Sequence, residues 1–139
     1  MMILKVLFIC TNNLCTSVIA TSVFNNLAEK RSIDAVSDSA GIGASAGERA
    51  DPFAIEVMKE IDIDISSHLS KNITPQMLKD YDFLFVMSMA QKDKLIAFDE
   101  TIIPKIKVME INDPYGKGIE QYRVCRNEIV SYIDQLLNQ

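Results

Sequence analysis

The chain has 139 residues, of which 48% are hydrophobic and 24% charged, and its formal net charge is −5 at pH 7. This length, with only four prolines and five glycines, predicts one folded domain over residues 1–139 and excludes a long disordered tract. The negative charge offers no overall positive field to nucleic acid or an anionic membrane, and the apolar N-terminal segment MILKVLFI is too short to span a bilayer and lacks a signal-peptide cleavage pattern, so we expect a cytoplasmic protein.

Strand-like and helix-like segments alternate along the chain. In order, the sequence predicts a strand at 3–9, a helix at 17–30, a strand at 36–40, a helix at 52–61, a short helix from 74, a strand at 83–87, a helix at 91–98, a strand at 106–109 and a helix from 119 onward. Ser17 is expected to cap the first helix, and a proline stands at the first position of the next two. This alternation predicts an α/β fold with a parallel sheet, helices on both of its faces, and ligand sites at the carboxyl ends of its strands.

Two candidate catalytic residues follow strands of this sheet. Cys10 ends the first strand in FICTNNLCTS, just before the first helix, and Asp113 follows the last strand in NDPYGKG. The N–H groups and dipole of a helix N-terminus bind phosphate or another oxyanion and favour the thiolate form of a nearby cysteine. A thiolate nucleophile and a carboxyl that protonates a leaving oxygen are the two components of phosphate ester cleavage through a covalent intermediate.

The loop and the turn together resemble the low-molecular-weight protein tyrosine phosphatase family, whose fold is shared with thioredoxin-coupled arsenate reductases. The family loop reads Cys-x-Gly-Asn-x-Cys-Arg-Ser, and here it reads Cys10-Thr11-Asn12-Asn13-Leu14-Cys15-Thr16-Ser17. The Asp-Pro-Tyr of the family matches Asp113-Pro114-Tyr115, and the segments SAGIG, DPFAIEVMKEIDIDISSH and FLFVMS also resemble family segments in order. The resemblance spans nearly the whole chain and implies a flavodoxin-like, four-stranded parallel sheet.

The resemblance also implies roles for individual residues. Cys10 would be the nucleophile that forms a phosphocysteine, and Asp113 the general acid. Asn13 would shape the loop, Ser17 would hydrogen-bond the thiolate, and Tyr115 would line the mouth of the pocket. The phosphate-binding residues would be Thr11, Asn12, Asn13, Leu14, Cys15, Thr16 and Ser17. The substrate would be a phosphorylated protein, a small phosphate ester or an oxyanion, with no cofactor and no metal.

Thr16 departs from the family loop, which carries an arginine at this position. A planar guanidinium grips two phosphate oxygens, whereas a threonine hydroxyl donates one neutral hydrogen bond. Because the loss of a single oxyanion donor costs about 10²–10³ in rate, we expect impaired phosphatase activity. Arg49 and Lys117 are the candidate replacement cations, since the fold should bring both of their segments near the pocket.

Three functional hypotheses follow. The first is a phosphatase acting on a phosphotyrosine-like ester, and the second is an inactive pseudophosphatase that binds an anion or a protein as a regulatory module. The third is a thiol redox protein, in which Cys10 and Cys15 form a reversible disulfide. An arsenate-reducing version would need further cysteines after the third strand, and the segment MSMAQKDKLIAF contains none.

The remaining cysteine and the single histidine fit structural roles. Cys125 falls at apolar spacing on the last helix and is expected in the core, and His68 is expected to hydrogen-bond within a loop. No Cys/His cluster with metal-ligand spacing surrounds His68, so the sequence predicts no metal site.

Overall fold

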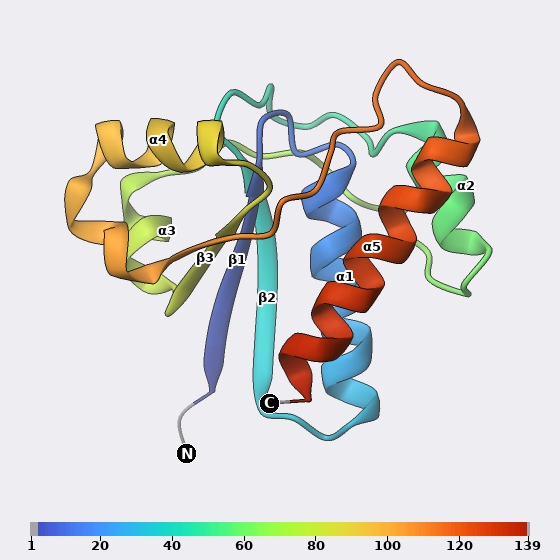
Figure 1. The fold of residues 1–139 in the computed structure, drawn as a ribbon, viewed down its shortest axis with the longest axis horizontal. Coiled ribbons are helices and arrows are strands. Elements are labelled where there is room, and N and C mark those ends of the chain that lie inside the picture. The colour runs from blue at the N-terminus through green and yellow to red at the C-terminus, as the bar shows by residue number, and fades with distance from the viewer. Residues whose placement is uncertain (1–2, 139) are drawn as a thin grey trace.

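The computed structural model describes residues 3–138, which form a four-stranded parallel sheet covered by helices (Figure 1). In chain order, the elements are β1 (Leu4–Cys10), α1 (Thr16–Lys30), β2 (Ala35–Gly41), α2 (Pro52–Lys59), α3 (Pro75–Asp80), β3 (Phe83–Val86), α4 (Met89–Phe98), the 3-10 helix η1 (Glu100–Lys105), β4 (Ile106–Val108) and α5 (Ile119–Leu137). The strand order is β2-β1-β3-β4, and all pairings are parallel. The predicted flavodoxin-like α/β fold is therefore confirmed.

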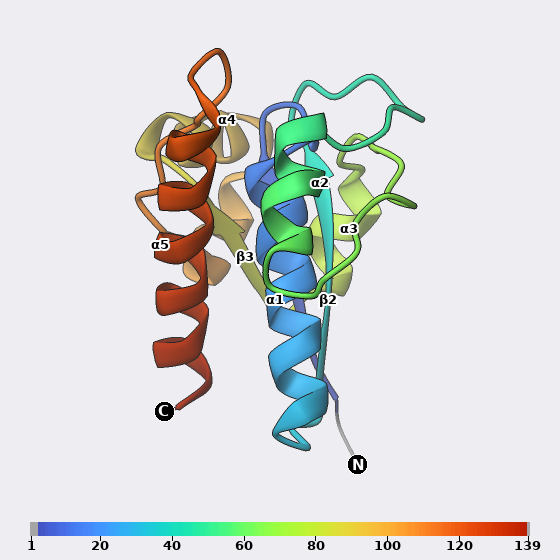
Figure 2. The ribbon, with the colours of Figure 1, turned by 90° about the vertical axis from the view of Figure 1, so that its right-hand side faces the viewer.

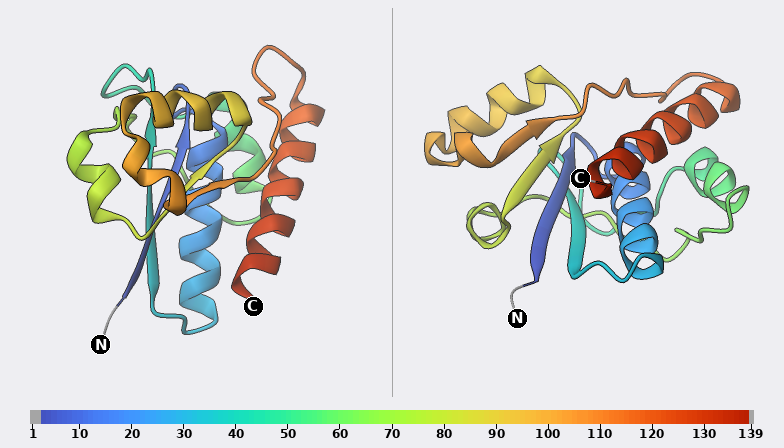
Figure 3. Two further views of the ribbon diagram at one scale, coloured as in Figure 1. Left: turned by 60° about the vertical axis from the view of Figure 1, so that its left-hand side comes forward. Right: turned by 60° about the horizontal axis from the view of Figure 1, so that its bottom comes forward.

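The sheet separates two hydrophobic cores. Helices α1, α2 and α5 cover one face, while α3 and α4 lie on the other (Figures 1 and 3). Alternate side chains of the central strand β1 pack into the two cores. Val6 and Phe8 pack on the α1 and α5 side, and Leu7 and Ile9 pack on the α3 and α4 side. Burial of β1 on both faces explains its continuous β-prone sequence.

Parallel pairing brings the ends of the strands to one edge of the sheet. Cys10, the last residue of β1, pairs with Gly41 at the end of β2. A Cβ atom at Gly41 would come within 2.6 Å of the Thr11 carbonyl oxygen, so glycine is required here for the close approach of the loop that follows β1. The loop at 10–17 therefore rests directly on the end of β2.

Three details differ from the sequence prediction. Ser17 does not cap α1, because the helix begins at Thr16 and its N-cap residue, Cys15, makes no side-chain capping bond. Strand β2 continues through Gly41, which includes the first residues of the segment predicted as a loop. The 3-10 helix η1 was not predicted, and its Pro104 interrupts any regular helical pattern. Within residues 3–138, no helix is both long and apolar enough to cross a membrane.

Helices α2 and α5 lie on the same side of the sheet (Figure 2), and a cluster of charged side chains joins them. Arg123 Nη2 donates to Glu60 Oε2 at 2.8 Å, and Arg126 Nη1 donates to Glu60 Oε1 at 2.7 Å. Arg126 also donates to the Val57 carbonyl oxygen at 2.8 Å, so this half of the cluster extends into the buried interface. Hydrogen bonds from Arg123 first, and then from Arg126, lower the pKa of Glu60 to about 2.

The depressed pKa of Glu60 predicts a pH-dependent contribution to stability. Because the folded-state pKa lies below the unfolded value of 4.5, the stabilisation is fully present above pH 4.5 and is lost as the pH falls towards 2. We expect Glu60→Gln to lower the Tm by a few degrees at pH 7, and the difference from wild type to vanish near pH 2. Thermal unfolding followed by circular dichroism across this range measures it. Glu56→Gln, which changes an exposed glutamate outside the cluster, is the matched control, and equal shifts in the two variants would contradict the prediction.

Candidate active site

A cavity of about 450 Å³ opens at the carboxyl ends of the strands. Both candidate catalytic residues, Cys10 and Asp113, line it. The residues that line it come from the loop after β1, the start of α2, the β3–α4 junction and the segment before α5. They are Cys10, Thr11, Asn12, Leu14, Cys15, Thr16, Glu48, Asp51, Met87, Ser88, Gln91, Ile111, Asn112, Asp113 and Tyr115. Cys10 and Asp113, about a hundred residues apart in sequence, thus border one cavity.

The Cys10 sulfur is held at the base of the loop by polar neighbours. The Asn13 backbone N–H donates to Cys10 Sγ at 3.2 Å, and the Ser17 hydroxyl lies 2.9 Å from the same sulfur. The thiol is buried yet reaches the cavity. Hydrogen-bond donors directed at a sulfur stabilise its anionic form, so this arrangement is suited to a thiolate nucleophile.

Asn13 organises the loop behind this sulfur. Its side-chain amide donates to Ser17 Oγ at 2.9 Å and Ser39 Oγ at 3.0 Å, and its Oδ1 accepts the Lys71 backbone N–H at 3.0 Å. The Asn13 carbonyl oxygen lies 2.7 Å from His68 Nε2, the loop hydrogen bond expected of this histidine. Asn13 is fully buried, and every polar group of its side chain is satisfied within the protein.

The backbone of the loop needs only one left-handed residue. Asn13 has a φ of 58°, and asparagine tolerates this region better than most residues. Asn12, which stands where the resemblance has a glycine, is not among the positive-φ residues of the described chain. The side chain of Asn12 therefore imposes no left-handed strain on the loop.

Charged side chains around the cavity are all acidic. Glu48, Asp51 and Asp113 line it, whereas no lysine or arginine within residues 3–138 does so. Arg49 is exposed and pairs its backbone with Leu69 in an isolated bridge, and Lys117 lines a separate small pocket beside Asp113. Neither of the candidate replacement cations thus borders the cavity that contains Cys10.

Asp51 connects the loop to two helices. Its backbone N–H donates to the Leu14 carbonyl oxygen at 2.9 Å, and its side chain accepts the N–H of Phe53 at the start of α2. The buried Tyr122 hydroxyl on α5 donates to Asp51 Oδ2 at 2.5 Å. Burial first, and then this hydrogen bond, raise the pKa of Tyr122 well above its ordinary value, so the phenol stays protonated and acts as a donor.

The second cysteine of the loop differs chemically from the first. Cys15 is buried, and burial is the main cause that raises its pKa far above the ordinary range of a thiol. Burial likewise raises the pKa of Cys125 to about 12, in the core position predicted for it. All three cysteines are free thiols in this structure. Cys15 is therefore a protonated thiol that lines the same cavity as Cys10.

Asp113 and Tyr115, in the segment before α5, also line the cavity. The Asp113 side chain accepts the Tyr115 backbone N–H at 3.0 Å, which fixes the turn through Pro114. Tyr115 is 75% exposed, so its ring stands at the solvent side of the mouth. Gln91 Nε2 donates to Thr11 Oγ1 at 3.3 Å and ties α4 to the loop.

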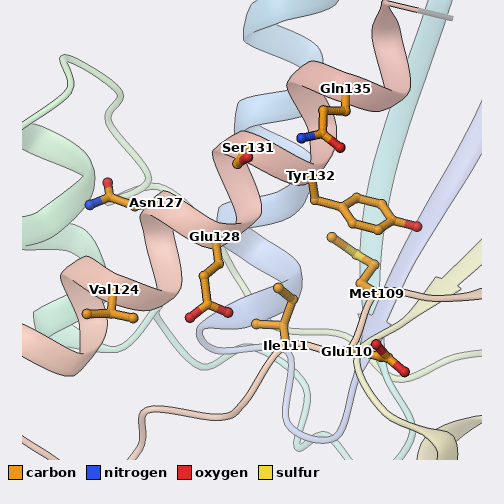
Figure 4. A pocket seen from close by; sticks show the side chains of 9 residues that line it. All are labelled: Met109, Glu110, Ile111, Val124, Asn127, Glu128, Ser131, Tyr132 and Gln135. Atoms are coloured by element: carbon orange, nitrogen blue, oxygen red, sulfur yellow. The ribbon is translucent and has the colours of Figure 1, made fainter.

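A larger but shallower groove lies elsewhere, between the segment after β4 and one side of α5 (Figure 4). Met109, Glu110 and Ile111 contribute from the segment, and Glu128 and Tyr132 contribute from the helix. No cysteine or histidine lines this groove. Within residues 3–138, no group of three or more His, Cys, Asp or Glu side chains is arranged to hold a metal ion. Of these two hollows, the cavity at Cys10 is the one lined by cysteines.

Several residues that build the site were not predicted from the sequence. Asp51 was interpreted only as a helix start, and Glu48, Gln91 and Tyr122 carried no local signal of a site. Lys71 and Ser39, which hold Asn13 in place, were likewise not singled out. Ser39 and Asp51 lie in the segments SAGIG and DPFAIEVMKEIDIDISSH, and the resemblance of these segments to family segments was the one available indication that they belong near the loop.

Comparisons with known proteins find relatives along nearly the whole chain. The family model described as "Low molecular weight phosphotyrosine protein phosphatase" matches residues 5–139. A low molecular weight phosphotyrosine protein phosphatase of Schizosaccharomyces pombe is 29% identical and covers 96% of this chain and 95% of its own. A protein-arginine-phosphatase of Bacillus subtilis is 27% identical over 98% of this chain and 96% of its own.

Solved structures show the same similarity. The crystal structure of a low molecular weight protein tyrosine phosphatase from T. tengcongensis superposes with a TM-score of 0.93 at 32% identity, and covers 97% of this chain and 98% of that one. The arginine phosphatase from Geobacillus stearothermophilus superposes with a TM-score of 0.90 at 28% identity, and covers 97% of this chain and 91% of that one. The chain belongs to the low molecular weight phosphotyrosine protein phosphatase family.

Proposed function

We propose that this protein, as one domain over residues 1–139, hydrolyses phosphate monoesters of phosphotyrosine type through a phosphocysteine on Cys10. In the first step the Cys10 thiolate attacks phosphorus, the bond to the leaving oxygen breaks, and Asp113 donates its proton to that oxygen. In the second step water attacks the phosphocysteine, Asp113 takes up a proton from it, and inorganic phosphate leaves while the thiolate is regenerated.

The observation that carries this proposal is the support of the Cys10 sulfur. The Asn13 N–H at 3.2 Å and the Ser17 hydroxyl at 2.9 Å favour a nucleophilic thiolate, and the sulfur borders the same cavity as the Asp113 carboxyl. The loop from Thr11 to Ser17 leads into the N-terminus of α1, where backbone N–H groups without partners in the helix suit a phosphate group. Relatives include phosphatases of both phosphotyrosine and phosphoarginine in proteins, so both are substrate classes to test.

We further propose that turnover is slow because Thr16 supplies no cation to the phosphoryl group. The side chain lies on the first residue of α1 and borders the cavity, and no basic side chain within residues 3–138 accompanies it. Charge that develops on the phosphoryl oxygens is then opposed only by N–H and hydroxyl dipoles. The same observation favours the second candidate, a pseudophosphatase that binds an anion or a phosphoprotein without turnover.

A redox function remains the third candidate because Cys10 and Cys15 are free thiols that line one cavity. The high pKa of Cys15 makes it a poor attacking thiolate at neutral pH, so Cys10 would have to be the nucleophile in any disulfide exchange. Mass spectrometry of the peroxide-treated protein tests it, because a disulfide removes two hydrogens and protects Cys10 from alkylation.

The function is tested by hydrolysis of p-nitrophenyl phosphate by reduced protein, from mildly acidic to neutral pH. We expect slow, continuous release of nitrophenol that falls to background in Cys10→Ser, because a serine hydroxyl is not ionised at this pH. Cys125→Ser, which removes a buried thiol on α5 that does not line the cavity, is the control for a general effect of losing a cysteine. Equal rates in wild type and Cys10→Ser would refute the hydrolase and leave the binding module.

A further inference from the structure

We propose that the cavity has a subsite for a guanidinium group, and that the arginine filling it is carried by the phosphorylated protein, next to its phosphorylated tyrosine. This inference rests on the proposed function for the identity of the substrate. It goes beyond that function by assigning Glu48, Asp51 and Thr16 to the recognition of a cation that the chain itself lacks. The substrate would then supply the positive charge missing from the loop.

The carboxylates around the cavity have no cationic partners. The ion pairs within residues 3–138 involve other acidic side chains, and none includes Glu48, Asp51 or Asp113. A phosphate dianion entering such a cavity would bring more negative charge to a site that already holds several carboxylates, which is unfavourable unless a cation enters with it. The carboxylates of the cavity therefore favour a ligand that carries a positively charged group as well as its phosphate.

Glu48 and Asp51 differ in the number of hydrogen bonds that their carboxylates already accept within the protein. The Asp51 carboxylate accepts the Phe53 N–H and the Tyr122 hydroxyl, so it is fixed in position and half-buried. The Glu48 carboxylate is exposed and accepts no hydrogen bond from any residue in 3–138. A rigid carboxylate and a free one that line the same cavity can together receive several N–H donors of a guanidinium.

The hydroxyl of Thr16 is a second, independent indication that a ligand binds in the cavity, because it has no hydrogen-bond partner within residues 3–138. Its side chain is only 4% exposed, yet none of the hydrogen bonds found within residues 3–138 engages its hydroxyl. Every fully enclosed side-chain nitrogen or oxygen within residues 3–138 has a hydrogen-bond partner, so the Thr16 hydroxyl is not fully enclosed, and Thr16 lines the cavity. A hydroxyl in this position can accept from a guanidinium and donate to a phosphate oxygen.

Arginine fits this subsite better than lysine. The guanidinium offers five N–H donors in a planar fork, so it can contact a carboxylate on one edge and a phosphate oxygen on the other, whereas an ammonium is a compact, strongly hydrated point charge. Arginine is therefore the expected occupant of the subsite, and lysine serves as the comparison in the test.

The test compares phosphotyrosine peptides that differ only beside the phosphotyrosine. One peptide carries arginine on both sides, a second carries citrulline, which has the same shape without the charge, and a third carries lysine. We expect kcat/KM for the arginine peptide to exceed that for the citrulline peptide about tenfold, with lysine in between. Binding of the three peptides to Cys10→Ser protein, followed by fluorescence anisotropy, gives the same comparison without turnover.

Matched variants separate the subsite from the overall charge of the protein. Glu48→Gln should reduce the preference for the arginine peptide to about threefold or less, because it removes a cavity carboxylate. Glu56→Gln makes the same change of net charge on an exposed residue of α2 that does not line the cavity, and it should keep the full preference. A loss of preference in both variants would mean long-range attraction of cations and would overturn the subsite.

The two readouts keep this inference distinct from the proposed function. If no peptide is hydrolysed but the arginine peptide binds Cys10→Ser protein more tightly than the citrulline peptide, the hydrolase fails and the subsite stands. If all peptides are hydrolysed at one rate and bound with one affinity, the hydrolase stands and the subsite fails. Absence of binding to any of the peptides also overturns the subsite.

Discussion

Thr16→Arg is expected to hydrolyse p-nitrophenyl phosphate about 10²–10³ times faster in kcat than the wild-type protein. The substituted side chain starts at the first residue of α1, beside Cys10, and can extend into the cavity of about 450 Å³. A bidentate guanidinium would hold two phosphoryl oxygens and oppose the charge that develops on them in the transition state. Steady-state kinetics at mildly acidic pH measures the gain.

Thr16→Lys is the matched control for this variant. It adds the same charge on a flexible stem without the planar fork, so its gain should be much smaller. If arginine gives no gain, the loop does not hold the phosphoryl group where a cation can reach it, and the missing guanidinium is not what limits turnover. In Thr16→Arg, the preference for arginine over citrulline peptides should also disappear, because the chain then carries its own guanidinium.

Asn13→Ala is expected to lower the free energy of unfolding by about 3–4 kcal/mol, the largest loss from a single residue of the loop. The change removes hydrogen bonds to Ser17, Ser39 and Lys71 and leaves the Lys71 N–H without its acceptor. It also places alanine at a φ of 58°, which adds a backbone cost of about 1 kcal/mol. Urea unfolding followed by circular dichroism gives the difference.

Two neighbouring substitutions divide this loss into its parts. Asn13→Gly removes the same side-chain bonds but tolerates the left-handed backbone, so it should be less destabilising than alanine by about 1 kcal/mol. Asn12→Ala changes an exposed residue without positive φ and should stay within about 0.5 kcal/mol of wild type. A loss below about 1 kcal/mol in Asn13→Ala would show that the polar contacts around Asn13 contribute little net stability.

The sequence predicted the sheet and its helices well because their signals are local. The apolar run of β1 and the Asp-Pro and Thr-Pro helix starts each correspond to an element of the structure. The failed prediction at Ser17 has a physical cause. A serine before an apolar helix is ordinarily a cap, but here its hydroxyl is engaged by Cys10 and Asn13 inside the first turn.

The long-range contacts of the site could not be predicted in the same way. Asp51 and Tyr122 are 71 residues apart, and Asn13 and Lys71 are 58 apart, so no periodicity or turn signal relates the members of either pair. The acidic character of the cavity also depends on which side chains line it. Glu48 and Arg49 are adjacent in sequence, yet only Glu48 borders the cavity.

The hydrogen bond between Tyr122 and Asp51 also has a consequence for the order in which a nascent chain matures. Synthesis runs from the N-terminus, so the loop at 10–17 leaves the ribosome long before α5 (Ile119–Leu137), which carries Tyr122. The backbone N–H of Asp51 donates to the Leu14 carbonyl oxygen, and its carboxylate accepts the hydrogen bond from the Tyr122 hydroxyl. A nascent chain that ends before α5 therefore contains Cys10 but lacks the Tyr122 hydroxyl that holds Asp51, so the loop at 10–17 gains its full set of contacts only after α5 has emerged.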